Sequence, residues 1–152
     1  MAKKFWLMKS EPTVYSIDDL ARDGKSGWNG VRNFLARNFM KAMALGDRVL
    51  FYHSSVDPAG VAGIMEVAKL AYPDPTQFDA KSEYHEPRAT ADAPVWFHVD
   101  VRFVEKLPRL VALDELKRER PLKSMMLFSH SRLSVQPVER AAFDRIVSLS
   151  RR

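Results

Sequence analysis

The strongest constraint on the fold is an alternating stretch in the second half of the chain. From Val95 to Phe103 every odd position is Val or Phe, whereas the even positions hold Trp, His, Asp and Arg. Alternation with a period of two is the pattern of a strand that buries one face. We therefore expect a strand over residues 95–104 with its odd face in the core. A half-buried strand of this kind is typical of antiparallel sheets.

The rest of the chain reads as short strands and helices without repeated strand–helix–strand units. We expect further strands at residues 4–8, 48–54, 61–72 and 132–138, the middle two forming a hairpin. We expect helices at residues 16–20, 34–45, 113–119 and 138–150, with Gly24 and Gly46 ending the first two. The predicted inward residues of the second helix are Phe34, Leu35, Phe39, Met43 and Leu45. Those of the last helix are Phe143, Ile146, Val147 and Leu149. This order favours an α+β fold on a small, mostly antiparallel sheet or barrel with short surrounding helices.

Length and cysteine content exclude several classes of protein. A chain of 152 residues suggests one domain, and the absence of Cys excludes disulfide frameworks, Cys-ligated zinc and iron–sulfur clusters. The apolar segment Phe5–Met8 is too short for a signal peptide or a membrane span. We expect a soluble, cytoplasmic, monomeric protein that does not bind membranes.

The charge is basic but unevenly distributed. The net charge is +5, while residues 42–101 carry more Asp and Glu than Lys and Arg. A basic protein with an acidic middle segment suggests a directional field that attracts an anionic partner such as nucleic acid. An ordinary solvated basic surface explains the same composition equally well.

Common motifs for cofactors and metals are missing from the sequence. The segment Gly24–Ser26 resembles the end of a phosphate-binding loop, but Asp19 stands where that motif needs its first glycine. The histidines show no metal-ligand spacing: His53, His85, His98 and His130. We therefore expect no cofactor and no metal site.

The segment GWNGVRN, residues 27–33, is the most informative local feature. It places Trp28 between Gly27 and Gly30, and glycine permits tight turns and close approach of a ligand. An aromatic face, the amides of Asn29 and Asn33, and the Arg32 guanidinium together supply what a bound nucleotide needs. The structural alternative is that Trp28 plugs the end of a barrel and Arg32 forms a salt bridge.

Several long motifs, in order, resemble the EVE domain family. They are WLMKSEP, WNGVRNFLARN, GDRVLFYHSS, AGIMEVAKLAYPDPTQFD, VWFHVDVRFV and RLSVQPV, and they span almost the whole chain. The resemblance implies a single domain over residues 1–152 with a PUA-like fold, related to YTH, SRA and ASCH domains. It also implies a reader of a modified base in DNA or RNA, with that base flipped or single-stranded in an aromatic-walled pocket.

The same resemblance, together with the loop at residues 27–33 and the segment after the first strand, indicates which residues form the pocket. The predicted ligand-binding residues are Lys9, Ser10, Glu11, Trp28, Asn29, Arg32, Asn33, Tyr52, His53, Trp96, Ser134 and Gln136. Arg32 and Arg37 are predicted to contact flanking phosphates. Trp96 is either a second pocket wall or a side chain packed under a helix.

Two other functions stay open beside the reader hypothesis. A hydrolase of modified nucleosides on the same scaffold would use Lys9 and Glu11 as base and proton relay. A protein-interaction module would use the exposed loop Tyr72–Pro94. We favour a binding domain over an enzyme, because no pairing of a nucleophile with a base is visible in the sequence.

Overall fold

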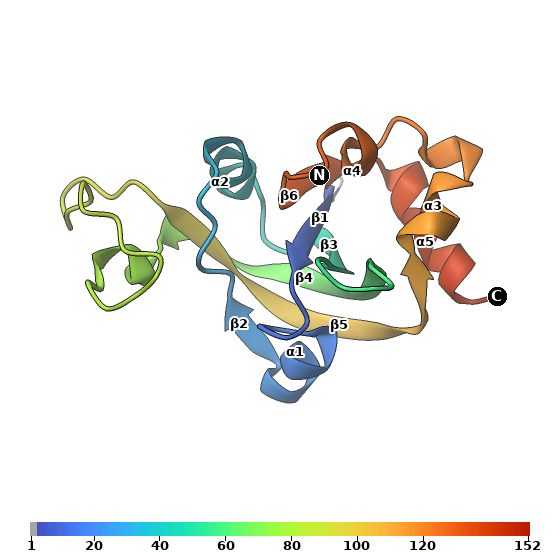
Figure 1. Ribbon diagram of the computed structural model, residues 1–152, viewed down its shortest axis with the longest axis horizontal. Coiled ribbons are helices and arrows are strands. Elements are labelled where there is room, and N and C mark those ends of the chain that lie inside the picture. Colours follow the sequence, from blue (N-terminus) through green and yellow to red (C-terminus); the bar gives the residue numbers. More distant parts are fainter. Residues whose placement is uncertain (1–2) are drawn as a thin grey trace.

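The computed structural model describes residues 3–152 as a mixed α+β fold (Figure 1). Its six strands are β1 (Phe5–Ser10), β2 (Lys25–Gly27), β3 (Arg48–His53), β4 (Gly60–Pro73), β5 (Phe97–Ala112) and β6 (Val135–Val138). The α-helices are α1 (Ile17–Asp23), α2 (Phe34–Lys41), α3 (Leu113–Lys117), α4 (Met126–Ser129) and α5 (Arg140–Ser150). Two short 3₁₀ helices, η1 (Pro75–Phe78) and η2 (Arg120–Leu122), complete the list. The α+β class expected from the sequence is confirmed.

The strands form one sheet in the order β2-β5-β4-β3-β1-β6. All neighbours are antiparallel except β1 and β3, which run parallel and are connected through α1, β2 and α2. The expected closure into a barrel is wrong. Within residues 3–152, β2 and β6 are the two edges, and they are only three and four residues long. Each edge strand pairs with one neighbour, and β2 does not pair with β6, so the sheet is open.

The alternating segment does form a strand, but β5 starts at Phe97 and continues to Ala112. Val99 and Val101 are fully buried, which confirms the predicted inward face. His98 on the opposite face is also buried, because its ring packs against Tyr72 of β4 at a centroid distance of 4.5 Å. Both faces of the sheet are therefore covered at this point.

The prediction for the second helix is wrong in its length and for three of its five inward residues, whereas Met43 is buried and Phe39 packs against the core as predicted. Helix α2 ends at Lys41, and the residues it turns inward are Ala36 and Met40, followed by Met43 in the next turn. These positions share one face at spacings of four and three residues. Three residues predicted to be inward are instead exposed: Phe34, Leu35 and Leu45.

The first and last helices follow the sequence closely. Ser16 and Asp19 form the predicted capping box at the start of α1, and Gly24 is its C-cap. Helix α5 buries Phe143, Ile146 and Leu149 in a core under one face of the sheet. Trp28, Met40 and Phe51 belong to a second core on the α1 and α2 side. Among residues 3–152, no helix has the length and apolar character needed to cross a membrane.

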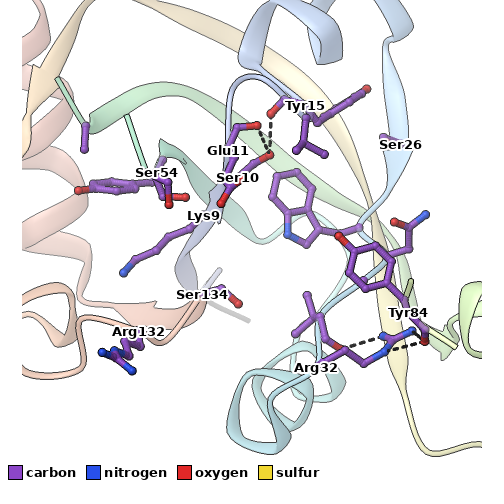
Figure 2. A pocket seen from close by; sticks show the side chains of 18 of the residues that line it. Lys9, Ser10, Glu11, Tyr15, Ser26, Arg32, Ser54, Tyr84, Arg132 and Ser134 are labelled. Carbon is purple, nitrogen blue, oxygen red and sulfur yellow. Dashed lines mark hydrogen bonds between the residues drawn. The ribbon is translucent and has the colours of Figure 1, made fainter. Parts of the chain in front are cut away.

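The parallel pairing of β1 and β3 places functional candidates together. Their registers align Lys9 with Tyr52 and Ser10 with His53, so both strands end at the same edge of the sheet. The loop after β2 and the segment before β6 approach this edge, and Tyr84 joins them from the long β4–β5 connection (Figure 2).

Candidate functional site

A cleft of about 900 Å³ opens at the carboxyl ends of β1 and β3. This volume lies within the range of ligand pockets, about 300–1,000 Å³. Figure 2 shows Arg32 and Tyr84 at one side of the cleft and Lys9 and Arg132 at the other. The lining residues include Lys9, Ser10, Glu11, Val14, Tyr15, Trp28, Asn29, Arg32, Tyr52, Ser54, Glu83, Tyr84, Ser131, Arg132 and Ser134.

The structure brings most of the predicted site residues together here. Those that line the cleft are Lys9, Ser10, Glu11, Trp28, Asn29, Arg32, Tyr52 and Ser134. Those that lie outside it are Asn33, Arg37, His53, Trp96 and Gln136. The residues inside the cleft come from the ends of β1 and β3, the loop after β2 and the segment before β6.

Trp28 both packs in the core and lines the cleft. It is 8% exposed, its ring meets Phe51 edge-on at a centroid distance of 5.3 Å, and its backbone N–H donates to the Val99 carbonyl. The two interpretations of this residue are thus not exclusive. Its indole is held by packing, so its position in the cleft does not depend on a ligand.

The glycines beside Trp28 make room for the protein's own aromatic rings. A Cβ at Gly30 would lie 2.8 Å from the Tyr84 ring, and Gly30 also has a φ of +84°. A Cβ at Gly27 would lie 2.9 Å from Cε1 of His98. The sequence suggested close approach of a ligand, but here the close approach is to Tyr84 and His98.

Arg32 is fully engaged inside the protein. Its Nε and Nη2 donate to the Tyr84 carbonyl, Nη2 also to Thr76 Oγ1, and Nη1 to the Val31 carbonyl and to Asp74 Oδ2. These contacts use all five N–H donors of a guanidinium. Arg32 has no donor left for the phosphate it was predicted to contact. The salt bridge to Asp74 matches the structural alternative drawn from the sequence.

Asp74 is the anchor of this side, and sequence reasoning missed it. Its carboxylate is 1% exposed and also accepts from the Gly30 N–H and from the N–H and hydroxyl of Thr76. Burial alone would raise the pKa of Asp74, but the hydrogen bonds from Thr76, Gly30 and Arg32 lower that pKa overall. A signal was present, because Asp followed by Pro is typical of a helix N-cap with Pro at the first position.

Trp96 packs under helix α2 rather than in the cleft. Its ring stacks on Phe34 at a centroid distance of 4.8 Å, and its Nε1 donates to Glu86. Gln77, which is fully buried, accepts from the Trp96 backbone N–H and fixes the β4–β5 connection to it. Of the two roles considered for Trp96, the structure shows the packing role.

The other predicted residues outside the cleft have local structural partners. Asn33 caps α2 by accepting from the Ala36 N–H, and Gln136 is buried and donates to the Leu133 carbonyl. His53 accepts from the Ile17 N–H through Nε2, and burial lowers its pKa. Arg37 donates to the Val95 carbonyl at 2.9 Å.

The opposite side of the cleft carries cations. Lys9 Nζ donates to the Ser131 carbonyl at 2.7 Å and lies 5.7 Å from the centroid of the Tyr52 ring. Burial lowers the pKa of Lys9. Arg132 is exposed, and within residues 3–152 it makes no hydrogen bond or ion pair. Sequence reasoning missed Arg132, Tyr84 and Ser131, because they come from irregular segments without periodicity.

Comparison with known proteins identifies the family. The family model of the EVE domain matches residues 4–149. This chain belongs to the EVE domain family. Mouse thymocyte nuclear protein 1 is 44% identical over 164 residues, an alignment that covers 95% of this EVE domain chain and 73% of that protein.

Solved structures share the fold of this EVE domain. A hypothetical protein from Leishmania major is 49% identical with a TM-score of 0.96, covering 99% of this chain and 96% of that one. Human THYN1 protein, in complex with DNA containing 5-methylcytosine, is 41% identical with a TM-score of 0.95, covering 99% of each chain. An ASCH protein from Zymomonas mobilis, 12% identical with a TM-score of 0.57, shows likeness of fold alone.

Proposed function

We propose that this EVE domain binds DNA carrying a modified cytosine and seats the modified base in the cleft beside Trp28. The observation that carries the proposal is the cleft itself, which joins a fixed indole, free polar groups and a cationic rim. The human relative was solved with DNA containing 5-methylcytosine, and its chain matches this one over 99% of its length. That similarity supports the same ligand class here.

The cleft supplies a group for each part of a nucleotide. Trp28 and Tyr52 offer aromatic surface, and stacking of a base on an aromatic ring contributes about 1–3 kcal/mol. Asn29 is exposed, and its side-chain amide makes no hydrogen bond within residues 3–152, so it is free to bind a base edge. Lys9 and Arg132 place positive charge on one side for the phosphates.

The expected preference for a methylated base is modest. Burying one additional methyl group contributes about 0.8 kcal/mol, which is roughly a fourfold change in affinity. A larger preference requires hydrogen bonds that the unmodified base leaves unmade. Base flipping out of a duplex would lower the affinity for duplex relative to a single strand, because unpairing costs a few kcal/mol.

The test compares otherwise identical oligonucleotides that contain cytosine or 5-methylcytosine, each as a single strand and as a duplex. Fluorescence anisotropy at one fixed salt concentration measures the affinities. The wild-type chain should bind the methylated member several-fold more tightly. Equal affinity for both members would overturn the proposal.

A pair of tryptophan variants separates the cleft from general packing. Trp28→Phe should remove most of the preference, because a smaller ring leaves a gap where the base stacks. Trp96→Phe is the matched control, since Trp96 is buried to a similar degree but does not line the cleft. The control should keep the preference even if it lowers stability.

RNA binding, the cytoplasmic location, the monomeric state and the hydrolase alternative remain predictions from the sequence. The same anisotropy measurement with RNA oligonucleotides of matching sequence tests RNA binding. Incubation of the chain with N4-acetylcytidine, followed by chromatography, tests the hydrolase alternative. Release of acetate by the wild-type chain would establish it.

A further inference from the structure

A second, smaller hollow of about 310 Å³ adjoins the cleft. We call it the side hollow. It is lined by Asn33, Leu35, His130, Ser131, Arg132 and Leu133. Ser131 and Arg132 also line the main cleft, so the two hollows meet at these residues.

The lining of the side hollow is apolar at Leu35 and Leu133 and polar at its other residues. Leu35 is 44% exposed although it lies on a helix whose other face is buried in the core. Asn33 and His130 bring an amide and an imidazole, and His130 Nδ1 lies 2.8 Å from the Ser129 hydroxyl. An exposed aliphatic side chain beside hydrogen-bonding groups suits a base and sugar better than it suits a simple anion.

Arg132 stands between the two hollows with its charge unneutralised. Within residues 3–152 it has no hydrogen bond and no carboxylate within ion-pair distance, whereas Arg32 across the cleft is neutralised by Asp74. The carboxylates that line the cleft are those of Glu11 and Glu83, and their charges act on Tyr84, where, after burial, they help to raise the pKa of the hydroxyl. A phosphate is therefore less favoured on the Tyr84 side, where Glu11 and Glu83 oppose the charge of Arg32, than on the Arg132 side.

We propose that the side hollow binds the nucleotide adjacent to the modified base, and that Arg132 contacts the phosphate that links the two. The inference rests on the proposed function and adds the path that the DNA strand takes out of the main cleft. The strand leaves the main cleft over Arg132 and lays its next nucleotide against Leu35. The chain then reads a dinucleotide unit rather than an isolated base.

The experiment compares two probes that share the modified base. One is the nucleoside 5-methyldeoxycytidine, which has no phosphate. The other is a single-stranded DNA trinucleotide with 5-methylcytosine in the middle and thymine on both sides. Isothermal titration calorimetry or chemical-shift perturbation measures both affinities. The wild-type chain should bind the trinucleotide at least tenfold more tightly than the nucleoside.

Two variants address the side hollow. Leu35→Asp should weaken trinucleotide binding at least tenfold, because a carboxylate repels the strand, and should leave nucleoside binding within twofold. Arg132→Ala should weaken trinucleotide binding about tenfold and lower the slope of log affinity against log salt by about one. Leu70→Asp and Lys123→Ala are matched controls, because both residues are exposed and line neither hollow. The controls should leave the affinity for both probes unchanged.

The outcomes separate this inference from the proposed function. If the wild-type chain binds both probes with equal affinity, or if the Leu35 and Arg132 variants behave like the controls, the side hollow takes no nucleotide and the inference is overturned. If the wild-type chain binds neither probe, the proposed function fails and the inference fails with it.

Discussion

Each side of the cleft carries an arginine, and the two differ in their hydrogen bonding within the protein. On one side, which we call the fastened side, residues 27–32 are held by hydrogen bonds to Asp74 and Tyr84. Every N–H donor of Arg32 forms a hydrogen bond within the protein on this side. On the open side, formed by Lys9, Ser131 and Arg132, the Arg132 guanidinium has no partner within residues 3–152. The first arginine shapes the cleft and the second is free to contact a ligand.

The charge of a side chain alone therefore does not identify a phosphate contact. Arg32 belongs to the same loop as Trp28, so the sequence favours it over Arg132 as a phosphate contact. Its side chain is nevertheless only 21% exposed and is paired with the buried carboxylate of Asp74. A paired guanidinium would have to break several hydrogen bonds to reach a phosphate. Arg132 is the better candidate for a phosphate contact because its N–H donors are unpaired within residues 3–152, although it lies outside the Trp28 loop.

The largest effect should come from breaking the fastened side at Asp74. Asp74→Ala removes the acceptor for Arg32, Gly30 and Thr76 and leaves a partly buried cation unpaired. We expect a loss of about 3–5 kcal/mol in the free energy of unfolding, measured by urea denaturation. Glu83→Ala, which removes an exposed carboxylate of the same segment, should change it by less than about 0.5 kcal/mol. Similar small losses for both variants would contradict the anchoring role.

The next largest effects should come from replacing each of the two arginines by alanine. Arg132→Ala should leave the unfolding free energy within about 0.5 kcal/mol and weaken binding of methylated DNA by about 1.5 kcal/mol, roughly tenfold. Arg32→Ala should instead lower stability, because Asp74 then stays buried without its cation. Denaturation and anisotropy on the same preparations check both. A stability loss in Arg132→Ala would remove the distinction between the sides.

A smaller effect is expected from Asn29, a polar loop residue whose side chain has no hydrogen-bond partner within residues 3–152. Asn29→Ala should leave stability unchanged and weaken binding by about 1 kcal/mol, the usual contribution of one hydrogen bond. Asn38→Ala on α2 is the control, since Asn38 is exposed and, among the described residues, its side chain accepts only from its neighbour Arg37. If both variants bind like the wild-type chain, Asn29 does not contact the base.

The smallest effect is a pH dependence of the unfolding free energy, which we assign to His98. Its ring packs against Gly27 in the fastened side. Burial lowers the pKa of His98 from 6.5; Lys69 and Arg32 lower it further, and Asp74 and Asp100 act in the opposite direction. Both ring nitrogens lack a hydrogen-bond partner within residues 3–152. The unfolded chain therefore binds more protons than the folded chain as the pH falls through 6.5, so the unfolding free energy should decrease.

His98→Leu should flatten this decrease, measured by urea denaturation at a series of pH values between 5 and 8. Burial also lowers the pKa of His53, so a residual slope should remain. His85→Leu serves as the control, because His85 is exposed. An unchanged slope in His98→Leu would show that His98 is not the titrating group.

Features that depend on neighbours along the chain can be predicted from the sequence. The alternation at residues 95–103, the capping box of Ser16 and Asp19 and the hairpin of β3 and β4 follow from local periodicity and local hydrogen bonds. Six motifs along the chain also indicated the family, which the family model confirms. Each motif is complete within a few residues, although together they span almost the whole chain.

Features that depend on distant partners become visible only in the folded chain. The inward face of α2 was set by packing against the sheet, which turned Ala36 and Met40 inward and left Phe34 and Leu35 exposed. Arg32 meets a carboxylate 42 residues away, whereas Arg132 meets none within the described residues. The strength of a charge at a surface depends on which opposite charge the fold places beside it, and no local pattern carries that information.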